Sequence, residues 1–292
     1  MDFLQLKYFQ TVARCEHMTH AAGELHIAQP SLSKSITRLE EELGVSLFDR
    51  TSRQIKLNQY GKVFLQNVDK IFAQLDDGKR QLHDMKDDEN HTIRLSFNNM
   101  YPFARLLKEY LSLYPNTKFH QTIGSFKEMQ QQLQNSQVDL CISSPPLTGD
   151  GIEYITLFSE EIFLVVPYDH RFSQRKSISL IEAADEEFIS LKEGFGIRDL
   201  TERLCLQAGF APNIIFESQV AINIPDMVKS NLGVALLPML GWEKNIERTS
   251  VWLHIDDIEA SRITALSYLK DRYLSSSALK FKDFAIKKYE NI

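Results

Sequence analysis

The spacing of hydrophobic and polar positions changes near residue 58 and again near residue 90. Residues 3–44 have the periodicity of three short helices, and residues 59–86 that of one long helix. Beyond residue 90, short β-rich runs alternate with amphipathic helical stretches. The predicted strands are Ile93–Phe97, Lys118–Ile123, Val138–Ile142, Phe163–Val166, Phe188–Leu191, Ile214–Glu217, Val234–Leu237 and Ile263–Leu269. This alternation is typical of α/β units around a mainly parallel sheet, and so many strands favour two small lobes over one.

Residues 19–44 predict two helices joined by a tight connection. Thr19 is the expected N-cap of the first helix. Gln29 and Pro30 open the second, where proline is tolerated because first-turn amides lack partners within the helix. The apolar stripe of the second helix consists of Leu32, Ile36, Leu39 and Leu43.

The opposite face of this second helix is basic and rich in hydrogen-bond donors. At about 100° per residue it presents Ser31, Lys34 and Arg38, with Thr37 beside them. The acids Glu40–Glu42 are confined to its end. Such a face suits a recognition helix that enters the major groove with its N-terminus first, although a solvated surface helix has the same pattern.

The segment that follows favours the recognition helix. In residues 45–57, two short apolar stretches flank a turn that bears Arg50, Arg53 and Lys56. This pattern indicates a β-wing whose tip can reach phosphates or the minor groove.

The long helix carries a heptad seam. Phe64, Val68, Ile71, Leu75, Gly78, Leu82 and Met85 recur alternately every four and three residues. Charged residues lie off the seam. We therefore expect Phe64, Val68, Ile71, Leu75 and Leu82 to pair with a second copy, the alternative being a helix packed on its own domain. A dimer would present two recognition helices, hence a double-stranded DNA target with approximate dyad symmetry.

Composition and motifs exclude several classes. The chain has 292 residues, 43% hydrophobic and 25% charged, and a net charge of −6, which argues against non-specific coating of nucleic acid. No apolar run approaches the roughly 18 residues of a membrane span, and the start lacks a secretory pattern, so we expect a cytoplasmic protein. No HExxH, GxSxG, Walker or GxGxxG motif occurs, and neither cysteines nor histidines show metal-ligand spacing. We therefore expect no enzyme, no cofactor and no metal.

The sequence resembles a known family along essentially its whole length. The run AA..L...QPSLSKSI..LE.ELGVSLFDR.SR...L...G, over residues 21–61, resembles the LysR-type transcriptional regulators, and the likeness continues through Phe163–Pro167, Gly194–Arg198, Ala208–Phe210 and Leu232–Pro238. It departs from the family at Ala28, where Ser or Thr is usual, and at Asn58, where Thr is usual.

The resemblance implies three parts and a set of DNA contacts. The parts are a winged helix-turn-helix (1–58), a dimerising linker helix (59–90) and an effector-binding domain (91–292) like a periplasmic binding protein. The domain would have Rossmann-like α/β lobes, lobe I about 91–161 and 267–292, lobe II about 162–266. The residues expected to face DNA are Gln29, Pro30, Ser31, Ser33, Lys34, Thr37 and Arg38 on the helix, and Arg50 and Arg53 on the wing. The family also forms tetramers, and an activator would contact RNA polymerase.

The expected effector site lies between the lobes. Its residues are Asn98, Asn99, Ser125, Ser143, Gly196 and Arg198. Asn98-Asn99, Ser125 and Ser143 follow predicted strands, where helix N-termini offer free amides to a small polar, anionic ligand. The same side chains could be helix caps only, and Arg198 could simply pair with Glu202. A solute-binding protein would share these lobes but would leave residues 1–90 unexplained.

Overall fold

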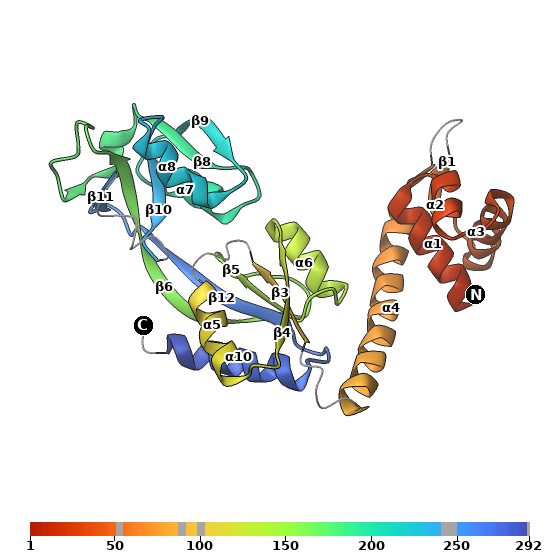
Figure 1. The fold of residues 1–292 in the computed structure, drawn as a ribbon. Helices are drawn as coiled ribbons and strands as arrows, with labels where there is room; N and C mark the ends of the chain where they lie inside the picture. Colours follow the sequence, from red (N-terminus) through yellow and green to blue (C-terminus); the bar gives the residue numbers. More distant parts are fainter. Residues whose placement is uncertain (51–54, 87–91, 98–102, 241–249, 291–292) are drawn as a thin grey trace. The chain divides into compact units, whose positions relative to one another are not determined.

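The computed structural model describes residues 1–50, 55–86, 92–97, 103–240 and 250–290 (Figure 1). Backbone contacts divide the chain into two compact units, Met1–Lys79 and Arg80–Ile292. The boundary falls within the long helix α4 (Gln59–Lys86). Among the described residues, no helix is both long and apolar enough to cross a membrane.

The first unit is a three-helix bundle with a small hairpin. Its elements are α1 (Phe3–Cys15), α2 (Met18–Glu24), α3 (Gln29–Leu43), β1 (Phe48–Arg50) and β2 (Ile55–Leu57), followed by the start of α4. Asp2 caps α1 in a reciprocal capping box with Gln5. The N-cap of α2 is His17, so the prediction of Thr19 was wrong. Glu16 in the left-handed region (φ 45°) turns the chain two residues earlier.

One hydrophobic core joins these elements. Phe9, Leu32, Ile36 and Leu39 are completely buried in it, which confirms the apolar stripe predicted for α3. Glu40, at the end of α3, accepts hydrogen bonds from the backbone amides of Leu47 (2.8 Å) and Phe48 (3.3 Å) and so holds the first strand of the hairpin.

Asn58 fixes the start of α4. Its side chain accepts from the Gly61 amide (2.9 Å) and donates to the Ser46 carbonyl (2.8 Å). Asparagine is among the best N-cap residues, so the departure from the usual threonine leaves the helix start intact.

The second unit contains two lobes. Its elements are β3 (Thr92–Phe97), α5 (Ala104–Leu113), β4 (Lys118–Ile123), α6 (Phe126–Gln134), β5 (Leu140–Ser143), β6 (Ile152–Pro167), β7 (Ser177–Ile178), β8 (Glu187–Leu191), α7 (Gly196–Gln207), β9 (Asn213–Ser218), α8 (Ile224–Lys229), β10 (Ala235–Pro238), β11 (Ser250–Ile255), β12 (Ser261–Leu269) and α10 (Ser276–Tyr289), with short 3₁₀ turns at Leu180–Ala183 and Ala221–Asn223.

Lobe I has helices on both faces of its sheet. In β5, Leu140 and Ile142 point into the core beneath α5 and α10, whereas Cys141 points into the core beneath α6. Helix α10 returns the end of the chain to this lobe (Figure 1).

Two long strands connect the lobes. Strands β6 and β12 pair antiparallel, with Ser261 opposite Glu161 and a β-bulge at the step where Phe158 faces Thr264. Strand β10 and strand β11 also pair antiparallel with β6, so the prediction of a mainly parallel sheet was wrong. Among the described strands, β3 pairs parallel with β4 and β5, β8 with β9, and β7 with β11, and Phe188 forms one further parallel bridge with Val234.

The pairing also sets where the chain crosses between lobes. Phe158 belongs to the lobe I core and Ile162 to the lobe II core, while Ala260 lies in lobe II and Leu266 in lobe I. The second crossing therefore precedes Leu266, a few residues before the expected place, because an antiparallel partner must cross at the same level as β6.

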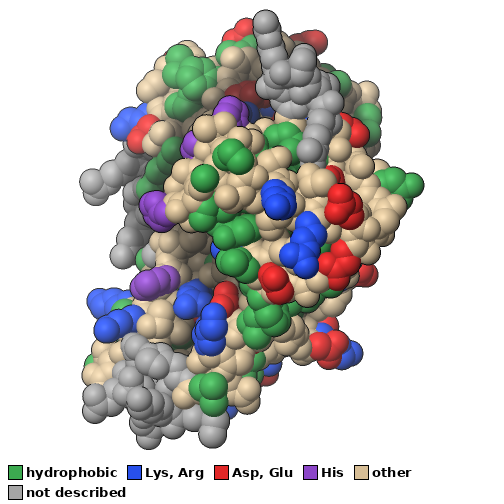
Figure 2. Space-filling model, turned by 90° about the vertical axis from the view of Figure 1, so that its right-hand side faces the viewer, with side chains coloured by type: hydrophobic (Ala, Val, Ile, Leu, Met, Phe, Trp, Pro, Cys, Tyr) green, Lys and Arg blue, Asp and Glu red, His purple; other side chains and the backbone are tan. Residues whose placement is uncertain are grey.

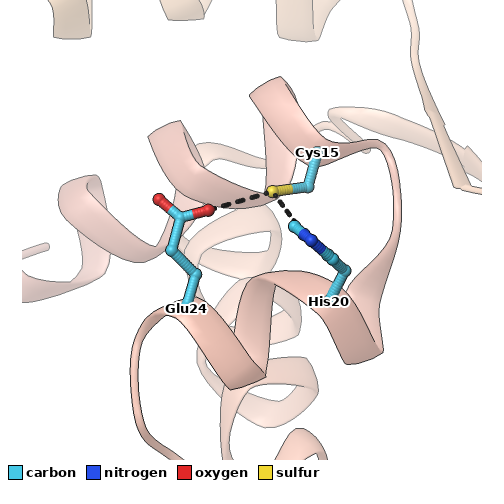
Figure 3. A group of neighbouring side chains, drawn as sticks. All are labelled: Cys15, His20 and Glu24. Carbon is cyan, nitrogen blue, oxygen red and sulfur yellow. Dashed lines mark hydrogen bonds between the residues drawn. The ribbon is translucent and has the colours of Figure 1, made fainter.

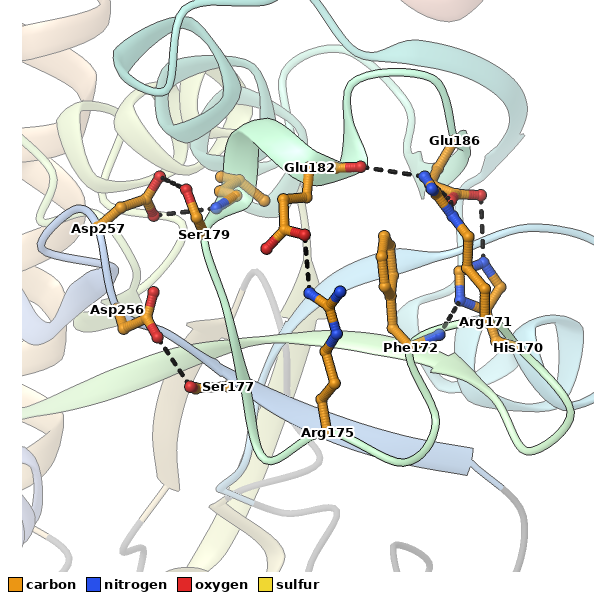
Figure 4. A network of polar contacts seen from close by, with 11 residues as sticks. His170, Arg171, Phe172, Arg175, Ser177, Ser179, Glu182, Glu186, Asp256 and Asp257 are labelled. Carbon is orange, nitrogen blue, oxygen red and sulfur yellow. Dashed lines mark hydrogen bonds and ion pairs between the residues drawn. The ribbon is translucent and has the colours of Figure 1, made fainter.

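A polar network holds the segment between β6 and β8 in lobe II (Figure 4). His170 and Arg171 both contact the Glu186 carboxylate, at 3.1 and 2.7 Å. Asp257 accepts from the Ser179 hydroxyl (2.6 Å) and the Leu180 amide (2.9 Å). Burial raises the pKa of Asp257, but these hydrogen bonds outweigh it, so the net pKa lies below its ordinary value.

Candidate functional site

The outward face of α3 is exposed and basic. Ser31, Lys34 and Arg38 are exposed, as are Gln29 and Pro30 in the first turn. Ser33 and Thr37 are half-buried at the edges of this face. The structure therefore brings together the whole set expected on α3.

The acids near this face are engaged elsewhere. Glu40 binds the amides that begin the hairpin, and Glu42 binds the N-terminal ammonium of Met1. Within the described part of the chain, neither Lys34 nor Arg38 forms an ion pair. Figure 2 shows basic, acidic and hydrophobic side chains interspersed on the visible face of the molecule. The basic side chains on this face of α3 are thus a few separate cations, not part of a broad positive surface.

The first turn of α3 offers few free backbone donors, because Pro30 has no N–H and the Ser31 and Leu32 amides donate to the Ala28 carbonyl, at 3.0 and 3.2 Å. Its N-cap is Ala28, which makes no side-chain capping bond, as expected from the missing hydroxyl. The partial positive charge of a helix N-terminus still favours an anion at this end of α3.

The wing is present as a two-stranded hairpin. Arg50 ends β1 opposite Ile55, and Lys56 is exposed on β2. Arg53 lies outside the described residues.

The seam of α4 divides into two halves. Phe64 and Val68 pack in the core of the first unit, and Val68 is completely buried. Ile71 and Leu75 are about two-fifths exposed, and Leu82 is 69% exposed. The alternative of a helix packed on its own domain is therefore correct for the first half, while the second half exposes apolar side chains.

The small residues expected between the lobes lie at their contact, largely engaged as caps. Ser125 caps α6 in a reciprocal box with Glu128, and Ser143 donates to the Pro145 carbonyl (2.8 Å). The Phe126 amide donates to the Gly194 carbonyl across the lobes (3.4 Å). A side chain at Gly196 would collide with the backbone oxygen of Ser144, so glycine permits this approach. Asn98 and Asn99 lie outside the described residues.

Arg198 forms ion pairs within the protein instead of the free ligand contact expected for it. Its guanidinium pairs with Glu202 and Glu217, and its side chain is only 11% exposed. Burial lowers the pKa of Arg198, but the two carboxylates outweigh this and the net pKa is raised. The structure thus favours the interpretation in which Arg198 pairs with Glu202.

A cavity of about 750 Å³ opens beside the lobe contact. It is lined by Ser144, Pro145 and Pro146 of lobe I, Gly196, Asp199, Leu200, Arg203 and Gln207 of α7, and Ile258, Glu259, Ser261, Arg262 and Ile263 at the crossing strands. Its volume is within the usual range of small-molecule sites. Of the expected effector residues that the structure describes, only Gly196 lines it.

Arg203 is the cation of this cavity that sequence reasoning missed. Among the described residues its hydrogen bonds are long, at 3.5 Å, to Gln207 and the Ser261 carbonyl. Arg262, by contrast, is held by Glu160 at 2.6 Å, with both side chains 10% exposed. Burial raises the pKa of Asp199. The available signal was the helical spacing of Gly196, Arg203 and Gln207, which places them on one face of α7.

Comparisons with known proteins agree with this architecture. Residues 3–62 match the family "Bacterial regulatory helix-turn-helix protein, lysR family", and residues 86–290 match "LysR substrate binding domain". The transcriptional dual regulator GltC of Bacillus subtilis is 33% identical over 297 residues, covering 100% of this chain and 99% of GltC. The uncharacterized HTH-type regulator YybE of the same organism is 36% identical, covering 98% of both chains.

Solved structures of similar fold are regulators as well. CbnR, a LysR family transcriptional regulator, superposes with a TM-score of 0.68 at 19% identity, covering 99% of each chain. Full-length CbnR complexed with its target DNA gives 0.58 at 21% identity, covering 99% of this chain and 100% of CbnR. This chain belongs to the LysR family: it is a DNA-binding transcriptional regulator with an effector-binding domain.

Proposed function

We propose that this regulator binds a specific double-stranded DNA site as a dimer or higher homo-oligomer, and that a small molecule held between the lobes of unit 2 modulates it. The observation that carries the proposal is the exposed basic face of α3, whose Lys34 and Arg38 have no ion pair among the described residues. We propose no catalytic activity. The two cysteines of unit 2 are buried, and burial raises the pKa of Cys141 and raises that of Cys205 to about 12, so neither offers a reactive thiolate.

In the proposed complex α3 lies in the major groove. Arg38 is long enough to reach a base edge, where a guanidinium pairs best with guanine, while Lys34 neutralises a phosphate. Gln29, Pro30 and Ser31 face the backbone at the start of the helix, with Ser33 and Thr37 at its edges. Arg50 and Arg53 of the wing contact the adjacent phosphates or minor groove.

The proposed dimer uses the exposed half of the α4 seam. Ile71 and Leu75 line a shallow groove of about 390 Å³ together with Phe3, Lys70 and Gln74. Phe3 is 57% exposed, although it lies edge-on to Phe72 at 6.5 Å. Exposed apolar side chains at heptad positions on a polar helix are typically buried against the same face of a second copy. Two copies would give the DNA site approximate dyad symmetry.

The proposed effector is a small carboxylate that also carries a hydrogen-bond donor. Arg203 supplies the cation in the cavity, taking the role first expected of Arg198. Asp199 and Glu259 would accept from a hydroxyl or ammonium group of the same compound. The proposal keeps Ser125 and Ser143 at the adjoining lobe contact. It also keeps Asn98 and Asn99, which lie outside the described residues. Binding here would favour one arrangement of the lobes about β6 and β12.

The experiment that tests the proposal is a gel-shift of the purified protein on DNA from around its own gene. We expect a discrete shifted complex that unlabelled DNA of the same sequence displaces and scrambled DNA of equal length does not. Equal displacement by both competitors would overturn sequence-specific recognition.

A further inference from the structure

The corner between α1 and α2 brings together three side chains of different chemistry. Cys15 is the last residue of α1, and His20 and Glu24 lie four apart on α2 and so share one helix face. Figure 3 shows the Cys15 sulfur between the other two side chains. The thiol lies 3.4 Å from a Glu24 carboxylate oxygen and 3.4 Å from Nδ1 of His20. All three potential ligand atoms lie within 4.8 Å of one another.

These distances fit a common tetrahedral ion. Zinc binds sulfur at about 2.3 Å and nitrogen or oxygen at about 2.0–2.2 Å, so two of its ligand atoms are about 3.6 Å apart across a tetrahedral angle. Both edges that meet at Cys15 match this separation within a few tenths of an ångström. The third edge, between Nδ1 of His20 and the Glu24 carboxylate, is no longer than 4.8 Å. These two atoms would therefore have to approach by at most about 1.5 Å to share the ion.

The local fold fixes this arrangement. Glu16, in the left-handed region, ends α1 immediately after Cys15. The ring of His17 then caps α2 by accepting from the backbone amide of His20 (3.2 Å). The Glu16 carboxylate also accepts from the Leu57 amide of the hairpin (3.0 Å), which anchors the turn. The protein's own hydrogen bonds therefore fix the end of α1 and the start of α2 without an ion.

The charges at the corner favour a cation. Within the described residues, no lysine or arginine pairs with Glu24, so its carboxylate is not neutralised by the protein. Cys15 is half-buried, while His20 and Glu24 are exposed, which leaves an approach from solvent and one open coordination position. Burial, and then the neighbouring Glu24, raise the pKa of the Cys15 thiol, so a metal ion must displace its proton to bind.

We propose that Cys15, His20 and Glu24 form a binding site for a divalent transition-metal ion of the Zn²⁺ class in the DNA-binding unit. The donor set of thiolate, imidazole and carboxylate selects such an ion over Mg²⁺ or Ca²⁺, which prefer oxygen alone. On binding, a metal–sulfur bond replaces the S–H bond, and the proton passes to solvent. The ion ties the end of α1 to α2 and stabilises the folded unit by mass action.

Cobalt titration of the chelator-stripped full chain tests the site. Co²⁺ takes the same ligands and reports a thiolate through a sulfur-to-metal charge-transfer band in the near ultraviolet. We expect this band to saturate at one equivalent of Co²⁺ per chain and to be abolished by Zn²⁺, which binds such sites more tightly. Mg²⁺ should leave it unchanged.

Variants decide which residues hold the ion. Cys15→Ser should lose the band, whereas Cys205→Ala, which alters a buried cysteine with no such neighbours, should keep it. His20→Ala and Glu24→Gln should each weaken Co²⁺ binding at least about tenfold, since even changes outside a ligand set cost that much. Circular dichroism confirms folding of each variant. Absence of the band in folded wild-type protein, or its persistence in Cys15→Ser, would overturn the proposal and leave a hydrogen-bonded trio only.

Discussion

Replacing Arg80 by methionine should destabilise the second unit far more than a typical charge removal on a helix. Arg80 lies on α4, and its guanidinium is 2.8 Å from the Asp139 carboxylate. The Asp139 side chain is 6% exposed and that of Arg80 is 21% exposed. Besides this ion pair, the carboxylate accepts from the Arg94 amide at 2.9 Å. Arg80→Met keeps most of the side-chain volume but leaves a buried carboxylate without its cation.

The expected loss follows from this burial. Removing one partner of a buried ion pair costs about 3–5 kcal/mol, and the partial exposure of Arg80 places this case near the lower figure, at about 3 kcal/mol. Lys79→Met is the matched control on the same helix. Lys79 pairs with Asp76 at 3.2 Å, but the side chains are 76% and 66% exposed, so its loss should be below about 0.5 kcal/mol.

The pH dependence provides a second check. Burial already raises the pKa of Asp139, and removal of the arginine raises it further. A carboxyl whose pKa is raised by folding costs stability above its folded pKa and nothing below its unfolded pKa. The deficit of Arg80→Met should therefore be full at neutral pH and shrink toward about pH 4.

Urea unfolding followed by tryptophan fluorescence measures this loss, because both tryptophans of the chain, Trp242 and Trp252, fall within residues 80–292. The double variant Arg80→Met/Asp139→Asn, which removes the stranded charge, should recover part of the stability. If Arg80→Met and Lys79→Met lose equal amounts of stability, or if the Arg80→Met deficit is independent of pH, the Arg80–Asp139 ion pair does not stabilise the second unit in this way.

Three further predictions concern assembly, the ligand and lobe II. Ile71→Asp places a charge in the exposed seam, so the variant should sediment as a monomer at micromolar concentration where wild type is a dimer or larger; a monomeric wild type would refute the seam. Arg203→Met should abolish the thermal shift given by any carboxylate found in a metabolite screen, while Arg198→Met, already paired with two glutamates, should retain it; the reverse result would move the site. Asp257→Asn should lower the melting temperature at neutral pH, with the difference vanishing as pH falls through the lowered folded pKa of Asp257; a pH-independent difference would exclude this linkage.

Local periodicity predicted the helices well because each helix is defined by a single stripe of buried apolar side chains. Leu32, Ile36 and Leu39 are spaced for a single buried face, and the structure buries that face completely. The outward positions of Lys34 and Arg38 follow directly from the same geometry. The start of α4 was placed correctly to the residue.

Pairing between distant strands was not predictable in the same way. Strand β6 runs from Ile152 to Pro167, but the polar residues Ser159, Glu160 and Glu161 interrupt its apolar pattern, so only its last part was predicted as a strand. Its partner β12 lies about a hundred residues later, and nothing in either run specifies an antiparallel register. The mainly parallel sheet was inferred from alternation of elements alone, which does not constrain long crossing strands.

Contacts with residues outside the local sequence pattern explain the remaining differences between the predictions and the structure. Val68 fits a heptad seam, yet the core of its own unit covers it. Arg198 was expected to face a ligand, but Glu217 from β9 completes its pairing, and that strand is distant in sequence. Cys15, His20 and Glu24 lack a metal-binding spacing because a turn, not a regular repeat, brings them together.

The most direct test of the central claim is fluorescence anisotropy on the protein's own operator, with Lys34→Ala and Arg38→Ala measured across a salt series. Loss of the Lys34 phosphate contact should weaken binding on all sequences and reduce the salt slope by about 1. Loss of Arg38 should cost about 1–3 kcal/mol on the operator and relax discrimination at one position of the site. Lys108→Ala, an exposed lysine of lobe I, should change neither quantity. Wild-type affinity and salt slope in both α3 variants would contradict the assignment of α3 as the recognition helix.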